Sequence, residues 1–302
     1  MRLILRHPAR AAVGGAIAIA FSGILYKAAD VSPSTGAFFR CAYALPALWL
    51  LVRFEERMLG PRPREFRRWA WLAGAFFAAD LLLWHHAIEA VGAGLATVLG
   101  NTQVVMVGLL AWALFSERPS NRALASIPIA MVGVVLISGV LEDGAYGENP
   151  ALGVVLGLLT GVAYSGFLLA LRHGAGERRR VAGPLFDATL ASAVLILPVG
   201  LLMGDLDLLP GLEAQAWLIV LALSAQVVGW LLITVSLPRL PAVVTSVLLT
   251  LQPVATVVLA AILIDEDPSV LQLFGAATIL CGLLVATIGR RAAGPEPVPE
   301  RA

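Results

Sequence analysis

Long apolar runs alternate along the whole chain with short polar connectors. Cutting the sequence at connectors rich in charge, proline or glycine leaves ten runs of about 18 residues or more, each long enough for a helix to cross about 30 Å of hydrocarbon. The alternation therefore predicts an all-α integral membrane fold of ten transmembrane helices. The predicted spans are residues 11–28, 35–53, 69–90, 94–115, 122–140, 151–171, 184–203, 215–235, 241–264 and 270–289.

The amino-acid composition agrees with lipid as the solvent of this fold. Hydrophobic residues make up 59% of the 302 residues and charged residues only 14%, against about 25% charged residues in a typical soluble domain. The mean hydropathy is +0.87. The formal net charge of +1 gives no reason to expect a nucleic-acid partner. The lipid bilayer is therefore the first partner that the sequence predicts.

Charged residues are distributed unequally between alternate connectors. Arginines concentrate in every second connector, as in residues 53–68 and 172–180, while the connectors between them carry acidic residues, as in 142–148. Because cytoplasmic loops are enriched in Lys and Arg, this alternation predicts that both termini are cytoplasmic. The basic N-terminal segment leads into an apolar run without a cleavage site, so we expect a retained first helix. High usage of Ala, Arg and Gly indicates a GC-rich bacterial genome. We therefore expect the protein in the inner (cytoplasmic) membrane of a bacterium.

The sequence lacks the residue patterns that an enzyme or a cofactor site would need. Cys41 and Cys281 lie inside apolar runs, so neither a disulfide framework nor a metal cluster is predicted. No Gly-x4-Gly-Lys-Ser loop occurs, so ATP drive is not expected, and the serines within the spans have no evident base. His85 and His86 would point about 100° apart on a helix, which argues against a metal site. We therefore expect that the protein is not an enzyme and binds no cofactor.

The two halves of the chain resemble each other. A shift of 149 residues aligns residues 93–120 with residues 242–269. Five spans in each half would place the halves in opposite orientations, which is the plan of secondary transporters with a binding site near the midplane. We expect a first five-helix repeat in residues 1–145 and an inverted second repeat in residues 146–302, ending in a short cytoplasmic tail. The matched residues include Gln103 with Gln252, Glu117 with Glu266, Pro119 with Pro268 and Ser120 with Ser269.

The fourth and ninth spans carry a pattern that is typical of a known family. In the ninth span a proline is followed by an apolar helix and an acidic end, from Pro253 to Glu266; the fourth span ends in Ser116-Glu117-Arg118 but has Val104 in place of the proline. With Arg40 early in the second span, these features make the chain resemble the EamA branch of the drug/metabolite transporter superfamily over nearly its full length. The resemblance implies a cavity walled by spans 1–4 and 6–9 and export of small metabolites, including amino acids and aromatic ones among them. Without the first proline, no proline kink is expected in the fourth span.

Charged and aromatic side chains within the spans are the main candidates for substrate binding. Asp80 and Trp84 lie one helical turn apart on the third span, and Gln226 and Trp230 repeat that spacing on the eighth. We expect these four side chains to form two walls of one cavity. Arg40 would anchor a carboxylate or phosphate, and Asp80 would bind an ammonium group or carry a proton. Two alternatives stay open, because an arginine near a span end can snorkel to the surface and tryptophan is common at the headgroup level.

Three further polar residues are candidates for the cavity. Tyr164 has small neighbours, Ser165 and Gly166, that leave room for close approach, and Tyr43 and Asn101 lie within or near spans that would wall the cavity. The alternative for the tyrosines is an anchoring role at a span end. The alternative for Asn101 is a hydrogen bond that joins two helices.

Ionisable residues near the span ends suggest gating or helix-end roles. His85 and Glu89 share one face near the predicted outer end of the third span. Together with Asp80 they would gate or couple transport, or they would only hydrogen-bond there. Glu117 and Glu266 terminate matched spans, where we expect them to organise helix ends and not to bind substrate.

The repeat and the polar residues within the spans predict a secondary transporter of small amphipathic metabolites that works by alternating access. The family resemblance implies that these are exported and are chiefly amino acids, including aromatic ones. Sugar-phosphate, nucleotide-sugar or drug transport is the alternative, but phosphorylated cargo would need several cations and the spans offer only Arg40 and Lys27. An intramembrane enzyme is the least favoured alternative. The second predicted partner is thus a small-molecule substrate, and the sequence is compatible with a monomer.

Overall fold

The computed structural model describes residues 8–60, 64–115, 121–138, 141–142, 144–174, 180–236 and 251–287. Over this part of the chain the regular structure is entirely helical, without a strand. Most helices are α-helices, and η1 is a π-helix. In chain order they are α2 (Pro8–Ala20), α3 (Ser22–Ala29), α4 (Pro33–Ala42), α5 (Leu45–Leu59), α6 (Arg64–Val91), α7 (Ala93–Gly100), α8 (Gln103–Phe115), α9 (Asn121–Ile137), α10 (Pro150–Gly174), α11 (Ala182–Met203), α12 (Leu212–Leu221), η1 (Ala222–Gly229), α13 (Trp230–Ser236), α15 (Leu251–Leu263) and α16 (Val270–Thr287).

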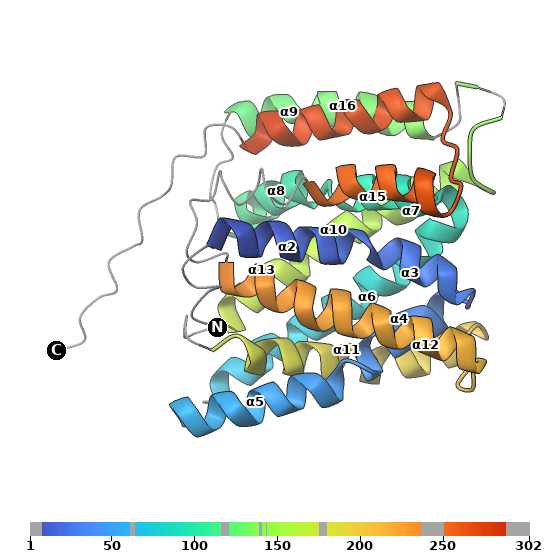
Figure 1. Ribbon diagram of the computed structural model, residues 1–302. Coiled ribbons are helices and arrows are strands. Elements are labelled where there is room, and N and C mark those ends of the chain that lie inside the picture. The colour runs from blue at the N-terminus through green and yellow to red at the C-terminus, as the bar shows by residue number, and fades with distance from the viewer. Residues whose placement is uncertain are drawn as a thin grey trace.

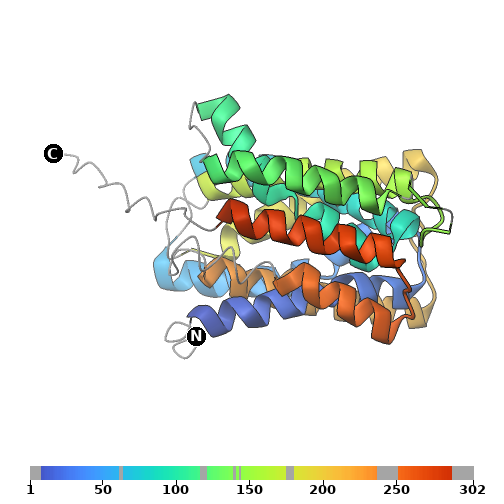
Figure 2. The same ribbon diagram turned by 90° about the horizontal axis from the view of Figure 1, so that it is seen from above.

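The helices lie side by side along one common direction (Figures 1 and 2). Six helical stretches are each long and apolar enough to cross a membrane, and three shorter apolar helices accompany them among the described residues. The chain reverses direction between successive spans, so that α2 begins and α16 ends at the same end of the bundle (left in Figure 1). The structure thus agrees with a multi-pass membrane protein.

Two ends of the bundle can be distinguished by the connections that meet there. The acidic end holds residues 30–32, 144–149, 204–211 and 264–269, and backbone and side-chain hydrogen bonds join these connections to one another or to α6 and α7. The arginine-rich end holds the end of α5, the start of α6 and the start of α11, which are joined by the contacts of Arg180 and Glu55. In Figure 1 the acidic end lies on the right.

Several predicted spans are broken where the sequence pattern predicts one continuous helix. The second span is interrupted between α4 and α5, just before Pro46, which has no N–H to donate and whose ring clashes with the carbonyl one turn earlier. The fourth span is interrupted between α7 and α8 although it lacks the proline. There Asn101 and Thr102 donate side-chain hydrogen bonds to the carbonyls of Thr97 and Leu99, and such local bonds compete with a regular helix.

The eighth span contains a local change of helix type. It begins as α12, continues as the π-helix η1 and ends as α13. Single π-helical turns are rare and occur frequently at functional sites, because the wider turn re-aims the side chains that follow. The described part of the ninth span begins at Leu251, so the start of that predicted span lies outside the described residues.

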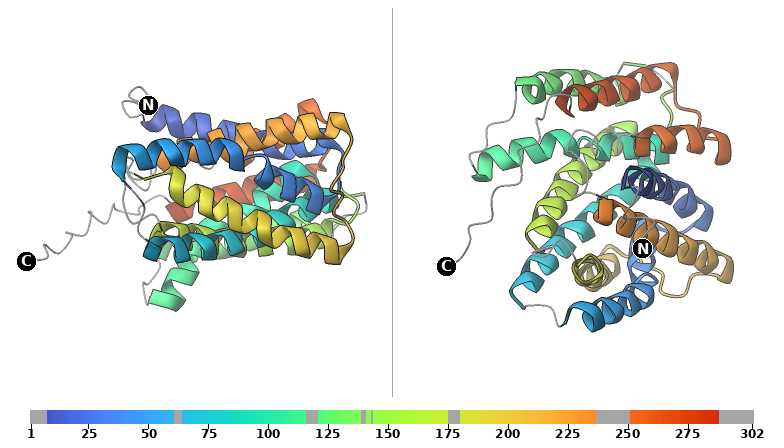
Figure 3. Two further views of the ribbon diagram at one scale, coloured as in Figure 1. Left: turned by 90° about the horizontal axis from the view of Figure 1, so that it is seen from below. Right: turned by 60° about the vertical axis from the view of Figure 1, so that its left-hand side comes forward.

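Helix α6 is the central element of the packing. It packs chiefly against α10 and α11 and also contacts α4 and α7, whereas α9 packs mainly against α16 at one edge of the bundle. Figure 3 shows α9 and α16 side by side at that edge. The two helices cross closely, since a Cβ atom placed on Gly133 would lie 2.6 Å from the carbonyl oxygen of Gly275. Small residues of this kind let membrane helices approach each other.

Candidate functional site

Arg40 on α4 is a buried cation within a membrane-spanning segment. Only 3% of the residue is exposed. Its Nε donates a hydrogen bond to Oε1 of Gln226 at 3.3 Å, and its guanidinium carbon lies 5.6 Å from the centre of the Trp84 ring. Gln226 in turn donates from Nε2 to the hydroxyl of Thr189 at 3.1 Å. The amide of Gln226 is therefore held with its oxygen towards Arg40.

Asp80 supplies a carboxylate near the same cation. It lies on α6 one turn before Trp84 and is 7% exposed. Arg40 and Asp80 interact electrostatically, but among the described residues no carboxylate lies within 4.0 Å of the Arg40 nitrogens. A charge in hydrocarbon costs about 2.5–3.5 kcal/mol on insertion scales. Arg40 and Asp80 thus form an arrangement of separated opposite charges, which a zwitterion can bridge.

Aromatic rings form the second part of the site. Trp230 at the start of α13 meets Tyr164 and Phe167 of α10 edge to face, with ring centres 5.9 Å and 5.1 Å apart. Phe77 of α6 stacks on Phe167 and also meets Trp230. The indole Nε1 of Trp230 is buried and has no hydrogen-bond partner in the described part of the chain. These rings provide an apolar wall with one unused donor.

The charged and the aromatic parts belong to neighbouring hydrophobic clusters. Trp84 packs in one cluster of buried residues and Trp230 in a second one. Tyr43, which follows α4, packs against both clusters, and its ring lies 4.9 Å from that of Phe39. Tyr43 therefore lies where the two clusters meet.

Asn101 lies at the break between α7 and α8. Its side chain donates to the carbonyl oxygen of Thr97 in the same span at 2.8 Å, and the residue is 6% exposed. Thr234 behaves alike on the eighth span, since its hydroxyl donates to the carbonyl oxygen of Trp230. Both side chains thus satisfy the backbone of their own helices.

His85 and Glu89 occupy different environments on α6. His85 is fully buried between Tyr26 and Trp84, its Nδ1 lies 2.7 Å from the carbonyl oxygen of Leu81, and its Nε2 has no hydrogen-bond partner among the described residues. Glu89 is exposed and accepts a hydrogen bond from the Tyr26 hydroxyl at 3.0 Å. Lys27 lies 3.5 Å from the second oxygen of Glu89. Tyr26 therefore connects the buried histidine to a surface ion pair at the acidic end.

His86 is a residue that the sequence analysis considered only as a metal ligand. Its Nε2 lies 3.4 Å from an Asp205 carboxylate oxygen, in the connection between α11 and α12. Asp205 also accepts a hydrogen bond from the backbone N–H of Ser34, and its carbonyl oxygen accepts one from the hydroxyl of Ser32. In the part of the chain that the structure describes, no group of three or more His, Cys, Asp or Glu side chains is placed to hold a metal ion. His86 therefore joins α6 to the connection between α11 and α12 at the acidic end.

Glu266 organises a helix end, as its position in the repeat predicted. Its carboxylate accepts hydrogen bonds from the backbone N–H groups of Ala93 and Gly94 at the start of α7. These are N–H groups that have no partner within the helix. Burial raises the pKa of Glu266 above its ordinary value, and the two N–H groups oppose part of that rise. Its counterpart Glu117 lies outside the described residues.

Three residues of the site had no clear signal in the sequence. Thr189 on α11 is one polar residue in an apolar span, and its contact with Gln226 depends on how two helices meet. Phe77 and Phe167 are ordinary apolar residues by type. Their positions offered a weak signal, because each lies three residues from a candidate, Asp80 or Tyr164, and therefore on a nearby helical face.

Comparison with known proteins identifies the class of this membrane protein. The sequence model of the EamA-like transporter family matches residues 9–139 and, a second time, residues 151–288. The chain belongs to the EamA-like transporter family. The predicted resemblance to this branch of the drug/metabolite transporter superfamily is thus confirmed, and the protein is a membrane transporter.

Individual relatives of this EamA-like protein agree with the family assignment. The uncharacterized transporter YwfM of Bacillus subtilis is 25% identical over 263 residues, covering 82% of this chain and 85% of its own. The uncharacterized transporter sll1319 of Synechocystis sp. is 25% identical over 264 residues, covering 76% and 74%. A solved structure described as "Crystal structure of protein" has 16% identity and a TM-score of 0.64, covering 93% of this chain and 98% of that one. That structure shows that the fold occurs among solved proteins.

Proposed function

We propose that this transporter exports amino acids, aromatic ones included, by alternating access. The observation that carries the proposal is the convergence of Arg40, Asp80 and the rings around Trp230 inside the membrane-spanning bundle. Ionisable residues in such a position are costly and mark substrate or ion pathways. A cation, a carboxylate and an aromatic wall are complementary to the carboxylate, the ammonium group and the side chain of an amino acid.

Arg40 is the group that would bind the substrate carboxylate. Its guanidinium has five N–H donors in a planar fork that matches a carboxylate, and only Nε has a hydrogen-bond acceptor among the described residues, at Gln226. The remaining donors are available to a ligand. Asp80 would bind the ammonium group at the other end of the zwitterion, so that neither charge of the substrate is left unpaired on entering the membrane.

The aromatic wall would bind the side chain of the substrate. Tyr164 and Trp230 present flat apolar faces, and aromatic pairs add about 0.5–1.5 kcal/mol to the free energy gained by burying apolar area. Trp84 lies beside Arg40 and would contact the polar part of the ligand. A site of this composition favours aromatic and large aliphatic amino acids over small polar ones.

Phosphorylated sugars fit this arrangement less well. A phosphate monoester carries more than one negative charge near pH 7, whereas Arg40 is accompanied by the carboxylate of Asp80. Lys27, the other basic residue considered from the sequence, is paired with Glu89 at the acidic end. We therefore rank sugar-phosphate cargo below amino acids.

Alternating access would use the two halves of the chain, residues 1–145 and 146–302, as inverted units that rock about the site. The two matches of the family model support this division. Contacts between the halves at the acidic end, such as His86 with Asp205 and Glu266 with Ala93, would break when that end opens. The arginine enrichment of the opposite end supports an orientation with both termini in the cytoplasm of a bacterium.

Uptake into liposomes that contain the purified protein tests the proposal. Labelled phenylalanine, leucine, lysine and a sugar phosphate are compared for the wild type, Arg40→Gln, Asp80→Asn and Trp230→Ala, with empty liposomes as the background. The matched control is Trp217→Ala, since Trp217 lies on the same span as Trp230 but is 38% exposed. We expect saturable phenylalanine and leucine uptake in the wild type and the control. Uptake of the sugar phosphate alone would overturn the proposal.

A further inference from the structure

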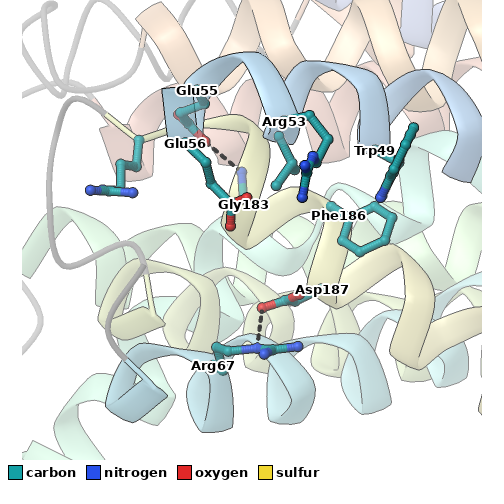
Figure 4. Close-up of a pocket in the computed structure, with 10 residues that line it drawn as sticks. Trp49, Arg53, Glu55, Glu56, Arg67, Gly183, Phe186 and Asp187 are labelled. Atoms are coloured by element: carbon teal, nitrogen blue, oxygen red, sulfur yellow. Dashed lines mark hydrogen bonds and ion pairs between the residues drawn. The ribbon is translucent and has the colours of Figure 1, made fainter. Parts of the chain in front are cut away.

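A cavity at the arginine-rich end lies apart from the Arg40 site. It has a volume of about 190 Å³ and is lined by residues of α5, α6 and α11. In Figure 4, Trp49 and Arg53 of α5 face Phe186 of α11 on one side of the cavity, and Asp187 of α11 meets Arg67 of α6 on the other. The cavity is thus bordered by both charged and aromatic side chains.

Some of the charged groups in this cavity neutralise one another. Nε of Arg67 lies 3.4 Å from a carboxylate oxygen of Asp187. The Glu55 carboxylate accepts hydrogen bonds from the backbone N–H groups of Val181 and Gly183 at 2.6 Å and 2.8 Å. Those N–H groups lie at the start of α11, where the helix dipole favours an anion. Glu55, Arg67 and Asp187 therefore serve the packing of α5 and α6 against α11.

Two charged groups of the cavity, Arg53 and Glu56, remain available to a ligand. Arg180 is not one of them, because it donates hydrogen bonds to the carbonyl oxygens of Gly60 and Leu59. Arg53 lies with its guanidinium carbon 5.9 Å from the centre of the Trp49 ring, a contact that leaves its N–H donors unused. The carboxylate of Glu56 has neither a hydrogen bond nor an ion pair within the described ranges. The cavity thus offers one cation and one anion.

The exposed tryptophans of this end place the cavity at the level of the lipid headgroups. Trp49 is 50% exposed, and Trp69 and Trp71 at the start of α6 are 45% and 41% exposed. Tryptophan is enriched where hydrocarbon meets the headgroups. Leu50 and Phe54, on the same helix as Arg53, are also exposed and offer an apolar surface for acyl chains.

We propose that this cavity binds the headgroup of a zwitterionic phospholipid with a primary ammonium group, such as phosphatidylethanolamine. The lipid phosphate binds to Arg53, whose planar N–H groups suit phosphate oxygens. The ammonium group, with three N–H donors, binds to Glu56. A choline headgroup has no N–H donor for Glu56, and an anionic headgroup lacks a positive charge for it. The site therefore distinguishes lipids by their headgroup amine, independently of what the protein transports.

Native mass spectrometry of the purified full chain tests this site. The protein is titrated separately with phosphatidylethanolamine, phosphatidylcholine and phosphatidylglycerol of identical acyl chains. We expect the ethanolamine lipid to bind about tenfold more tightly than the choline lipid, because only the former makes a charge-assisted hydrogen bond to Glu56. Glu56→Gln removes this preference, and Arg53→Gln weakens the binding of both lipids.

The control variant is Arg57→Gln, because Arg57 lies on the same helix, one turn after Arg53, and does not line the cavity. It is expected to bind all three lipids as the wild type does. Thermal melting of each variant in one detergent confirms that the fold is retained. The proposal is overturned if phosphatidylglycerol binds as tightly as phosphatidylethanolamine, or if Glu56→Gln keeps the preference. It is also overturned if soluble phosphoethanolamine displaces the lipid at equal concentration, since the ligand would then be a soluble phosphate ester.

Discussion

The Arg40 site and the crossing of α9 with α16 are both packed within the bundle, but the first is built from charged and aromatic side chains and the second from glycines and aliphatic side chains. Around Arg40 the structure buries a cation, a carboxylate and an indole whose N–H has no partner in the described residues. At the crossing, Gly133 and Gly275 bring two backbones together and Ile279 fills the space beside them. Buried charge costs stability in a membrane, whereas small residues gain it through close packing. We therefore expect substitutions around Arg40 to affect transport and substitutions at the crossing to affect assembly.

The largest expected effect on stability comes from Gly133→Leu. A side chain at this position would meet the carbonyl oxygen of Gly275 at 2.6 Å, and a backbone cannot move aside cheaply. We expect the variant to lose about 3 kcal/mol of stability, the upper range for overpacking, and to give little monodisperse protein after heating in size-exclusion chromatography. The control is Gly211→Leu, because a Cβ atom there meets nothing within 4 Å. Equal melting of the two variants would show that the crossing does not support the fold.

Arg40→Gln is expected to have the largest effect on transport. The glutamine keeps a polar group beside Gln226 but removes the charge that would bind the substrate carboxylate. Hydrogen bonds to charged groups contribute about 1.5–3 kcal/mol, so kcat/KM for phenylalanine should fall roughly 10- to 100-fold. The melting temperature should change little, because the variant removes the cost of burying one charge but leaves Asp80 buried without the opposite charge of Arg40. A parallel loss of folded protein and of transport would show that Arg40 stabilises the fold and does not bind the substrate.

Trp230→Phe is expected to have an intermediate effect that depends on the substrate. The phenyl ring preserves the edge-to-face contacts with Phe167 and Tyr164 but loses the unpartnered Nε1 donor and part of the ring. We expect KM to rise about tenfold for phenylalanine and less for alanine, because the substrate side chain packs on this ring. Uptake assays with both substrates measure the ratio. An equal rise for both would remove the aromatic wall from substrate selection.

Glu266→Gln is expected to have the smallest effect, visible in the pH dependence of stability. Burial raises the pKa of Glu266 from its ordinary value of 4.5, so the folded state favours the protonated form. The stability that this group contributes is present below pH 4.5 and is lost as the pH rises through the raised pKa. The melting temperature of the wild type should therefore fall over this range relative to that of the variant. If the melting temperatures of the wild type and the variant changed in parallel with pH, the raised pKa of Glu266 would be contradicted.

Six of the predicted spans could be predicted from the sequence, because the length and hydropathy of an apolar run are read directly from the order of its residues. The breaks within the predicted spans could not. In the fourth span the interruption arises from Asn101 and Thr102, whose side chains bond to nearby carbonyls, and residues of these types also occur within continuous helices. The π-helix η1 is likewise invisible in the pattern, since it changes the turn and not the hydropathy.

The candidate site was predictable as far as its residues are unusual for a membrane span. Arg40, Asp80 and Trp230 attract notice by type, and the structure brings Arg40 close to Trp84 and Gln226 from three different spans. Thr189 and the rings that support Trp230 are ordinary span residues, and only their tertiary neighbours give them a role. The pairing of His86 with Asp205 depends on how the connection between α11 and α12 folds over α6, which no local pattern encodes.

The proposed site recognises both charges of an amino acid together with its ring. Its most direct test is competition for labelled phenylalanine uptake by three unlabelled compounds: phenylalanine, phenethylamine, which lacks the carboxylate, and phenylpropionate, which lacks the amine. We predict that only phenylalanine competes at concentrations near its KM, and that phenethylamine loses this disadvantage in Arg40→Gln. Equal competition by all three compounds in the wild type would show that the ring alone is recognised and would contradict the roles of Arg40 and Asp80.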